Sequence, residues 1–428
     1  MSTKRRFLSS TKHLWNPHSK TCNNNPTITQ ITLIGFCFQN PALAGAGFFR
    51  IFVNMKEIKP LIKYTGGKYD EYKSFKNEIP EKINNYYEPF FGGGGVFFRL
   101  HNEGKIKGKS YINDLSKDLM DFYKNVCHDR FKKELVKISD AWVDVWEVVA
   151  KVYHEFGDTF FKVILGLNPL SDINCPLLMS CIERAVEDTW SLSEYDTHGF
   201  DLCEKMFNGI VDKAKRFIKK DISEDEKDLP EKLISTALHQ AFYFVVRDMY
   251  NDWLLGGEGY TDEEKSAQWF FIREFCYGSM FRFSHNGKFN VPYGGYAYNF
   301  KCFQCKIDNI CSPEVQDLFA KTKISNEDFE TFLNGKYYGY DDFIFLDPPY
   351  DSTFSDYDNN AFTREDQIRL RNFIVVLPCR WLLVIRKNDF ISELYKGYVQ
   401  VPFDKTYAYH ARGTYDEKNC THIAIRNY

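Results

Sequence analysis

The residues best suited to chemistry follow a continuous apolar run in the last quarter of the sequence. Residues 342–346 predict a buried central strand, and the strand ends in the motif Asp347, Pro348, Pro349 and Tyr350. Because neither proline can donate a ladder hydrogen bond, the strand stops there and the backbone carbonyl beside them is free to accept one. The competing interpretation is a strand-terminating turn whose aspartate caps a neighbouring segment.

The motif suits the chemistry of an exocyclic amine on an aromatic base. The Asp347 carboxylate and the adjacent carbonyl can accept hydrogen bonds from the two N–H groups of such an amine. The nitrogen lone pair is then directed out of the ring plane, toward an electrophilic methyl group. Positioning and electrostatics can carry this direct displacement, so we expect neither a metal nor a covalent intermediate. The Tyr350 ring would stack on a base extruded from its duplex.

A second segment with chemical potential lies earlier in the chain. Four consecutive glycines, Gly92 to Gly95, follow a predicted strand that ends at Glu88. Glycines let the backbone approach a ligand closely, and Asp114, at the end of the next strand, can accept hydrogen bonds from two ribose hydroxyls. The absence of a phosphate-loop Lys-Ser/Thr argues against a nucleoside triphosphate. Taken alone, the glycines could also form an ordinary flexible turn.

The elements around these two motifs predict an α/β protein with a doubly wound, mostly parallel sheet. Ser116 is a suitable N-cap, and Thr363 with Asp366 forms a capping box. The expected strands are 85–88, 110–113, 342–346, 380–385 and 421–426, and the expected helices are 96–100, 117–126 and 363 to about 376. Such a sheet binds ligands at the carboxyl ends of its strands, so both motifs should meet at one edge.

A long segment, residues 129–299, interrupts this pattern with amphipathic helical stretches such as 234–250. Near its end, Asn286-Gly287 between alternating apolar positions predicts a β-hairpin. Phe283 and Phe289 are expected to pack on their own domain. Other side chains of the hairpin could contact nucleic acid. Arg282 and Lys288 could bind phosphates or guanine edges, and the rings of Tyr293 and Tyr296 could stack on bases or wedge between them.

Composition sets wide bounds. The 428 residues are 44% hydrophobic and 26% charged, which is typical of a soluble globular protein with more than one domain. The net charge of −3 gives no global basic field, so a nucleic-acid surface would have to be local. Twelve scattered cysteines indicate reduced thiols, and we prefer thiols to zinc for Cys302, Cys305 and Cys311 because a fourth ligand is missing nearby. No apolar stretch is long enough to span a membrane.

The first 54 residues differ from the rest, since they contain no Asp or Glu and begin with a basic cluster. They could form an organelle transit peptide. We prefer the interpretation that Met55 is the true start and that residues 1–54 are a leader, disordered or outside the fold, because regular organisation begins there. The expected divisions are then 55–128 for the cofactor-binding half, 129–299 for a target-recognition domain and 300–428 for the catalytic half.

Taken together, the motifs resemble those of adenine-specific DNA methyltransferases related to the bacterial GATC methylases. The resemblance rests on residues 63–68, 88–97, 113–119, 326–329 and 347–350, in that order, and on the hairpin within 281–296. It implies an S-adenosylmethionine-dependent methyltransferase fold with an inserted, mainly helical recognition domain. It also implies that S-adenosylmethionine is held by Tyr64, Lys68, Phe90, Gly92, Gly94, Asp114, Asp328 and Asp347. The DNA contacts that it implies are Arg282, Pro292 and Tyr296, beside Lys288.

The resulting hypothesis is a site-specific enzyme that transfers a methyl group from S-adenosylmethionine to N6 of a flipped-out adenine in duplex DNA. A cytosine-N4 methyltransferase is the nearest rival, because the same acceptor pair would hold the cytosine amine. A non-catalytic, cofactor-binding DNA-recognition protein is the rival from another class. We expect a monomer without a membrane or metal partner, located with its DNA in the cytoplasm or another compartment and not secreted. A cognate restriction endonuclease is left open.

Overall fold

A seven-stranded sheet lies at the centre of the computed structural model, which describes residues 57–64, 66–197, 199–218, 220, 222–349, 362–406 and 419–428. The strand order is β3-β2-β1-β4-β5-β7-β6. Strand β7 pairs antiparallel with both β5 and β6, and the four other pairs of neighbouring strands are parallel. The strands are β1 Tyr86–Glu88, β2 Ser110–Asn113, β3 Thr322–Ser325, β4 Phe343–Leu346, β5 Arg380–Arg386, β6 Val399–Thr406 and β7 Asn419–Arg426. The strand order reverses between β1 and β4, and this is where such sheets bind ligands.

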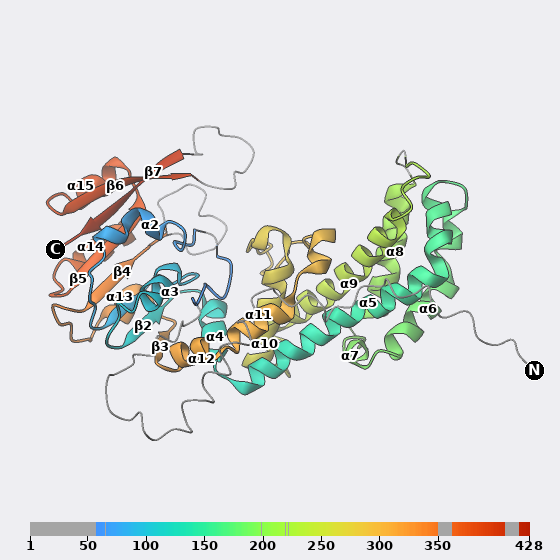
Figure 1. Ribbon diagram of the computed structural model, residues 1–428, viewed down its shortest axis with the longest axis horizontal. Coiled ribbons are helices and arrows are strands. Elements are labelled where there is room, and N and C mark those ends of the chain that lie inside the picture. The colour runs from blue at the N-terminus through green and yellow to red at the C-terminus, as the bar shows by residue number, and fades with distance from the viewer. Residues whose placement is uncertain are drawn as a thin grey trace, which may run out of the picture. The chain divides into compact units, whose positions relative to one another are not determined.

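Helices cover both faces of the sheet (Figure 1). Side chains alternate along β4, so Phe343 and Phe345 enter one buried cluster while Ile344 and Leu346 enter another. The first cluster includes residues of α2 Tyr72–Phe75, α3 Gly95–Asn102 and α4 Lys117–Asn125. The second includes residues of α13 Phe329–Leu333, α14 Arg364–Ile374 and α15 Asp389–Leu394. A strand buried on both faces explains why Phe343–Leu346 is apolar without alternation.

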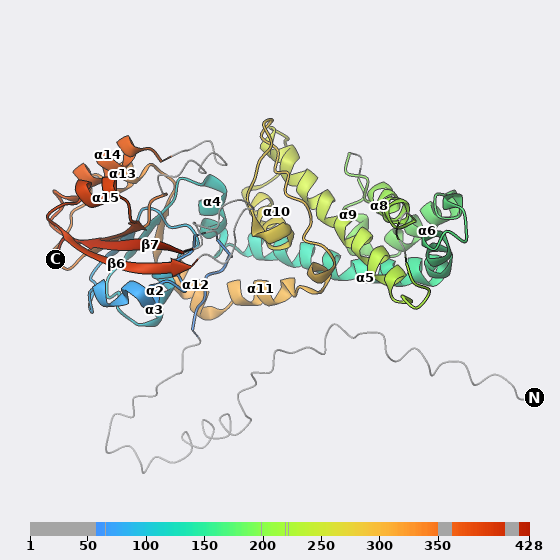
Figure 2. The same cartoon turned by 90° about the horizontal axis from the view of Figure 1, so that it is seen from above.

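The segment between α4 and β3 is mainly helical, as expected. Its helices are α5 Asp129–Ile164, α6 Pro176–Glu187, α7 Trp190–Ser193, α8 Leu202–Phe217, α9 Leu229–Leu254, α10 Asp262–Phe275, α11 Phe303–Ile310 and α12 Pro313–Ala320. Helix α9 packs against α5, α8 and α10, and α10 also packs against α4, beside the sheet (Figure 2). The division of the chain at 129 and 299 into domains stays a prediction.

The structure confirms the predicted capping box at Thr363 and contradicts the predicted free thiols at Cys302 and Cys305. The capping box at Thr363 is present, because its hydroxyl accepts from the Asp366 amide and its own amide donates to the Asp366 carboxylate. The expectation of free thiols is wrong for Cys302 and Cys305, which form a disulfide. Their Cα atoms are 5.3 Å apart at the start of α11, within the range that a disulfide can bridge.

Three regions of interest lie outside the described residues: the predicted leader, Tyr350 and the segment that follows it. In the part of the chain that is described, no helix is both long enough and apolar enough to cross a bilayer.

Candidate active site

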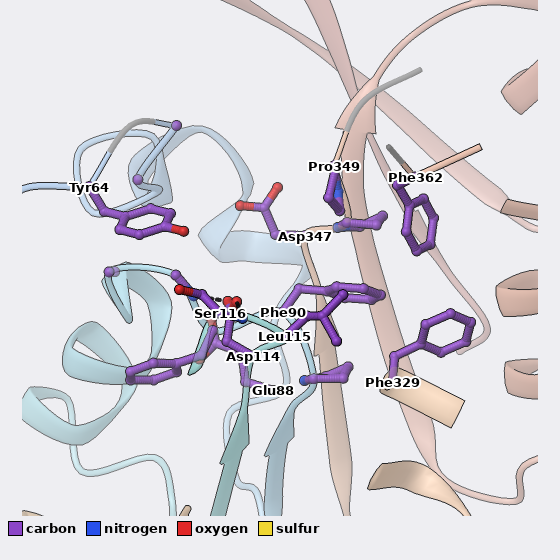
Figure 3. Close-up of a pocket in the computed structure, with 18 of the residues that line it drawn as sticks. Tyr64, Glu88, Phe90, Asp114, Leu115, Ser116, Phe329, Asp347, Pro349 and Phe362 are labelled. Atoms are coloured by element: carbon purple, nitrogen blue, oxygen red, sulfur yellow. Dashed lines mark hydrogen bonds between the residues drawn. The ribbon is translucent and has the colours of Figure 1, made fainter. Parts of the chain in front are cut away.

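A cavity of about 730 Å³ opens at the carboxyl ends of β1, β2 and β4. Figure 3 shows side chains from these strand ends around it, with Tyr64 on one side and Phe329 and Phe362 on the other. Most of the predicted cofactor and catalytic residues line this cavity: Tyr64, Lys68, Phe90, Gly92, Asp114, Asp328, Asp347, Pro348 and Pro349. The structure therefore brings together motifs that are separated by more than 200 residues in the sequence.

The glycine loop is shaped by close packing against the segment 63–69. An added Cβ at Gly93 would lie 2.8 Å from the Tyr64 Cβ, and one at Gly95 would lie 2.5 Å from the Tyr69 amide nitrogen. Gly94 has φ +66° and precedes the first turn of α3. It is not among the residues that line the cavity, and a Cβ there would meet the Phe91 ring at 2.4 Å. A side chain at Gly93, Gly94 or Gly95 would clash with these neighbouring atoms, so only glycine fits at the three positions.

Asp114 holds the glycine loop in place from the end of β2. Its Oδ2 accepts a 2.8 Å hydrogen bond from the Gly92 amide, and its Oδ1 accepts a 3.0 Å bond from the Ser116 amide. The neighbouring Asn113 is fully buried, and its amide donates to the carbonyls of Pro89 and Glu327. These bonds fix the ends of adjacent strands relative to one another, which preorganises the cavity wall.

The Asp347 carboxylate forms an ion pair with Lys68. Lys68 Nζ lies 2.8 Å from Asp347 Oδ1 and also donates to the Gly66 carbonyl at 3.1 Å. The Lys68 side chain is only 3% exposed and that of Asp347 is 20% exposed, so the pair is partly shielded from water. Burial raises the pKa of Asp347 above its ordinary value, and the nearby Lys68 charge opposes that rise. Within the same motif, the Pro349 carbonyl accepts from the buried Gln367 side-chain amide at 3.1 Å.

Glu88 lines the cavity and was not predicted as a site residue from the sequence. It is 2% exposed at the end of β1, and it accepts a 2.8 Å hydrogen bond from the Tyr86 hydroxyl. Burial, reinforced by the Asp347 and Asp114 charges, raises the pKa of Glu88 well above its ordinary value. Its position directly before the glycine loop was the available sequence signal.

The opposite end of the cavity is aromatic. The rings of Phe90 and Phe329 lie 5.5 Å apart, and Phe362 meets Phe90 edge-on at the same distance. Asp328 lines this end, but both of its oxygens pair with Arg369 at 2.9 Å. Its Oδ1 also accepts from the Glu330 amide and so caps α13. A ligand at Asp328 would therefore share the carboxylate with Arg369.

The predicted hairpin is present as a tight turn. Phe283 and Phe289 form an antiparallel bridge, and the Ser284 amide donates to the Lys288 carbonyl at 2.8 Å. Phe289 is buried, and its ring meets that of Tyr250 in α9 edge-on at 6.4 Å. The expectation that Tyr293 could stack on bases is wrong, because its ring is 7% exposed and its hydroxyl donates to Asn299. The four predicted DNA contacts are all exposed: Arg282, Lys288, Pro292 and Tyr296.

Four residues from the helical segment also line the cavity, and none of them was predicted there from the sequence: Trp269, Arg273, Phe281 and Phe283. Trp269 and Arg273 come from α10, while the two phenylalanines precede the hairpin turn. A cation inside the apolar run 269–275 was the sequence signal that could have found Arg273.

The chain belongs to the D12 class N6 adenine-specific DNA methyltransferase family, whose model matches residues 64–154 and 205–409. It is 27% identical to the type II methyltransferase M.CviBI of Paramecium bursaria Chlorella virus NC1A, over 87% of this chain and 100% of that protein. It is also 27% identical to the type II methyltransferase M.MjaIII of Methanocaldococcus jannaschii, over 80% of this chain and 89% of that protein. The protein is thus a site-specific, adenine-specific DNA methyltransferase, which confirms the family and activity predicted from its sequence.

Proposed function

We propose that the cavity at the ends of β1, β2 and β4 binds S-adenosylmethionine, which supplies the methyl group when bound. Its volume of about 730 Å³ lies within the range of small-molecule sites. Asp114 would accept from the ribose hydroxyls, and the Phe90–Phe329 end would pack on the cofactor's adenine. Tyr64 and Lys68 would face its amino-acid part. The glycine contacts support this arrangement, since a side chain at Gly93 or Gly95 would displace the loop that lines the cavity.

The target amine would be held by Asp347 and the adjacent backbone. The Pro349 carbonyl is already engaged by Gln367, so the carbonyl of Pro348 is the candidate second acceptor. Asp347 and this carbonyl would accept the two N6–H groups and turn the nitrogen lone pair toward the methyl donor. As positive charge develops on N6, the partly buried carboxylate would stabilise it. Lys68 favours the ionised form of Asp347, and this ion pair within the cavity is the observation that carries the proposal.

Tyr350 would stack on the flipped adenine, although it lies outside the described residues. Arg282, Lys288, Pro292 and Tyr296 would contact the DNA, and residues 129–299 would form the recognition domain. Both relatives named above are type II methyltransferases, which supports the same type here. A cognate restriction endonuclease would then be the partner in the cell. We infer a monomer that works where its DNA substrate resides.

The direct test identifies the methylated base. The protein would be incubated with methyl-labelled S-adenosylmethionine and duplex DNA, and the DNA digested to nucleosides for chromatography. We expect the label in N6-methyldeoxyadenosine. Label in N4-methyldeoxycytidine, or cofactor and DNA bound together without transfer, would contradict the assignment. Sequencing the modified bases in the same DNA would give the recognition site.

A further inference from the structure

Arg273 occupies an unusual position for a cation. It lies on α10, is 3% exposed and lines the cavity. One guanidinium nitrogen, Nη2, donates a 2.9 Å hydrogen bond to the Lys63 carbonyl. The guanidinium carbon lies 4.9 Å from the centre of the Tyr64 ring and 4.4 Å from that of Phe281. Arg273, which belongs to the helical segment, therefore contacts Lys63 and Tyr64, and Tyr64 is a predicted cofactor-binding residue.

The environment of Arg273 contains rings and a carbonyl where a carboxylate would be expected. Its Nε is buried and finds no hydrogen-bond partner within the described ranges. Burying a cation costs free energy, and contacts with ring faces and a carbonyl offset part of that cost. Two of the contacts that stabilise the guanidinium belong to neighbouring residues, Lys63 and Tyr64. The positive charge of Arg273 is thus stabilised in part by Lys63 and Tyr64.

The stretch that Arg273 contacts begins the loop that shapes the cavity. The Tyr64 ring covers the glycine loop so closely that a Cβ at Gly92 would approach it to 3.2 Å. Further along, Gly66 and Gly67 give the loop little intrinsic stiffness, and then Lys68 pairs with Asp347. A fixed anchor at Lys63 and Tyr64 therefore reduces the conformational freedom that the loop would lose on binding a ligand.

We propose that Arg273 is a positioning residue for the methyl-transfer reaction. From α10 it holds the Lys63 carbonyl and the Tyr64 ring, and so keeps residues 63–64 and 66–68 in the arrangement that binds the cofactor. This inference rests on the proposed function, in which that loop contacts S-adenosylmethionine. Because Arg273 acts through the loop, its loss raises the cofactor KM and leaves turnover at saturating cofactor nearly intact.

The test compares Arg273→Met, Arg273→Lys and a matched control, Arg247→Met, by calorimetry with S-adenosylhomocysteine and by steady-state kinetics. Arg247 also stacks on a ring, Phe244 at 4.4 Å, and its buried Nε has no hydrogen-bond partner among the described residues, but it does not line the cavity. Arg273→Met removes one hydrogen bond and one cation–π contact with the loop. This loss should raise the Kd for S-adenosylhomocysteine and the KM for S-adenosylmethionine by roughly tenfold. We expect kcat within about threefold of wild type, partial recovery in Arg273→Lys and no effect of Arg247→Met.

A double variant tests whether Arg273 acts through Tyr64. In a Tyr64→Leu background, Arg273→Met should weaken cofactor binding by much less than it does alone. Fully additive losses, an unchanged cofactor Kd in Arg273→Met, or a rise confined to the KM for DNA would each overturn the proposal. The variant Asp114→Ala distinguishes a failure of the proposed cofactor site from a failure of the proposed role of Arg273. If it leaves the cofactor Kd unchanged, the proposed cofactor site fails; if it weakens binding while Arg273→Met does not, only the role of Arg273 fails.

Discussion

In the proposed mechanism, the ion pair between Lys68 and Asp347 should make the reaction sensitive to pH. Asp347 would accept from the target amine in its ionised form, and Lys68 lowers an Asp347 pKa that burial raises. Replacing Lys68 by Met removes the lowering influence, so the pKa of Asp347 rises further. We expect the acid limb of the kcat profile to move to higher pH. An acid limb of Lys68→Met at the same pH as in the wild type would contradict this role. The control is Lys321→Met, which breaks an exposed pair with Asp317 and should leave the acid limb unchanged.

Glu88 predicts a pH-dependent stability. Burial raises its pKa in the folded state above the ordinary value of 4.5, so folding favours the protonated form. Its contribution is therefore fully present below pH 4.5 and is lost as the pH rises toward the folded-state pKa. The loss amounts to about 1.4 kcal/mol per pH unit across that window. Glu88→Gln should remove this dependence, so it should gain stability over wild type in urea denaturation as the pH rises. A difference that does not change with pH would contradict the assignment.

Motif residues could be located from sequence because their chemistry depends on residue type and order. Asp114, Lys68 and Asp347 lie at the cavity wall for that reason. Glu88 and Arg273 could not be assigned in the same way, because their properties come from burial and from partners distant in the sequence. Tyr293 shows the opposite error, since an aromatic residue suited to stacking on bases is buried and donates a hydrogen bond to Asn299.

At the scale of elements, the glycine loop and α3 give a test of close packing. Gly95→Ala would push a Cβ to 2.5 Å from the Tyr69 amide nitrogen, so it should displace the segment 63–69. We expect a loss of about 1–3 kcal/mol in stability and at least a tenfold weaker cofactor Kd, on the order of 1.4 kcal/mol. Gly104→Ala, just beyond the other end of α3, is the control.

The control separates strain from site disruption. Gly104 has φ +62° but no atom within 4 Å of an added Cβ. Its replacement should cost about 1 kcal/mol of stability without changing the cofactor Kd. Equal effects of the two substitutions on binding would show that the glycine loop does not shape the site.

Apolar strands and capped helices were predictable as elements, to within a few residues at their ends. The run 342–346 became β4, and the capping box at Thr363 begins α14. Strand β3 was not predicted because Thr322–Ser325 is short and partly exposed, and so lacks a continuous apolar run. It is fixed by parallel pairing with β2, from which it is separated by the helical segment.

At the scale of the whole molecule, the hairpin and the cavity should make separable contributions to DNA binding and cofactor binding. Combined Arg282→Ala and Lys288→Ala removes two exposed cations, so DNA affinity should fall and its log–log salt dependence should become shallower by about two. The Kd for S-adenosylhomocysteine should not change. The control pair is Lys151→Ala with Arg184→Ala, two cations that already pair with Asp188 and Glu155. An equal loss of salt dependence in the control would remove the hairpin from the DNA interface.

The central claim is that the Asp347 carboxylate orients the adenine amine for transfer. Single-turnover methylation of duplex DNA by Asp347→Asn, with S-adenosylhomocysteine affinity measured on the same sample, tests it most directly. We predict that the transfer rate falls by at least about a hundredfold while cofactor binding stays measurable. A wild-type transfer rate in Asp347→Asn would contradict the claim.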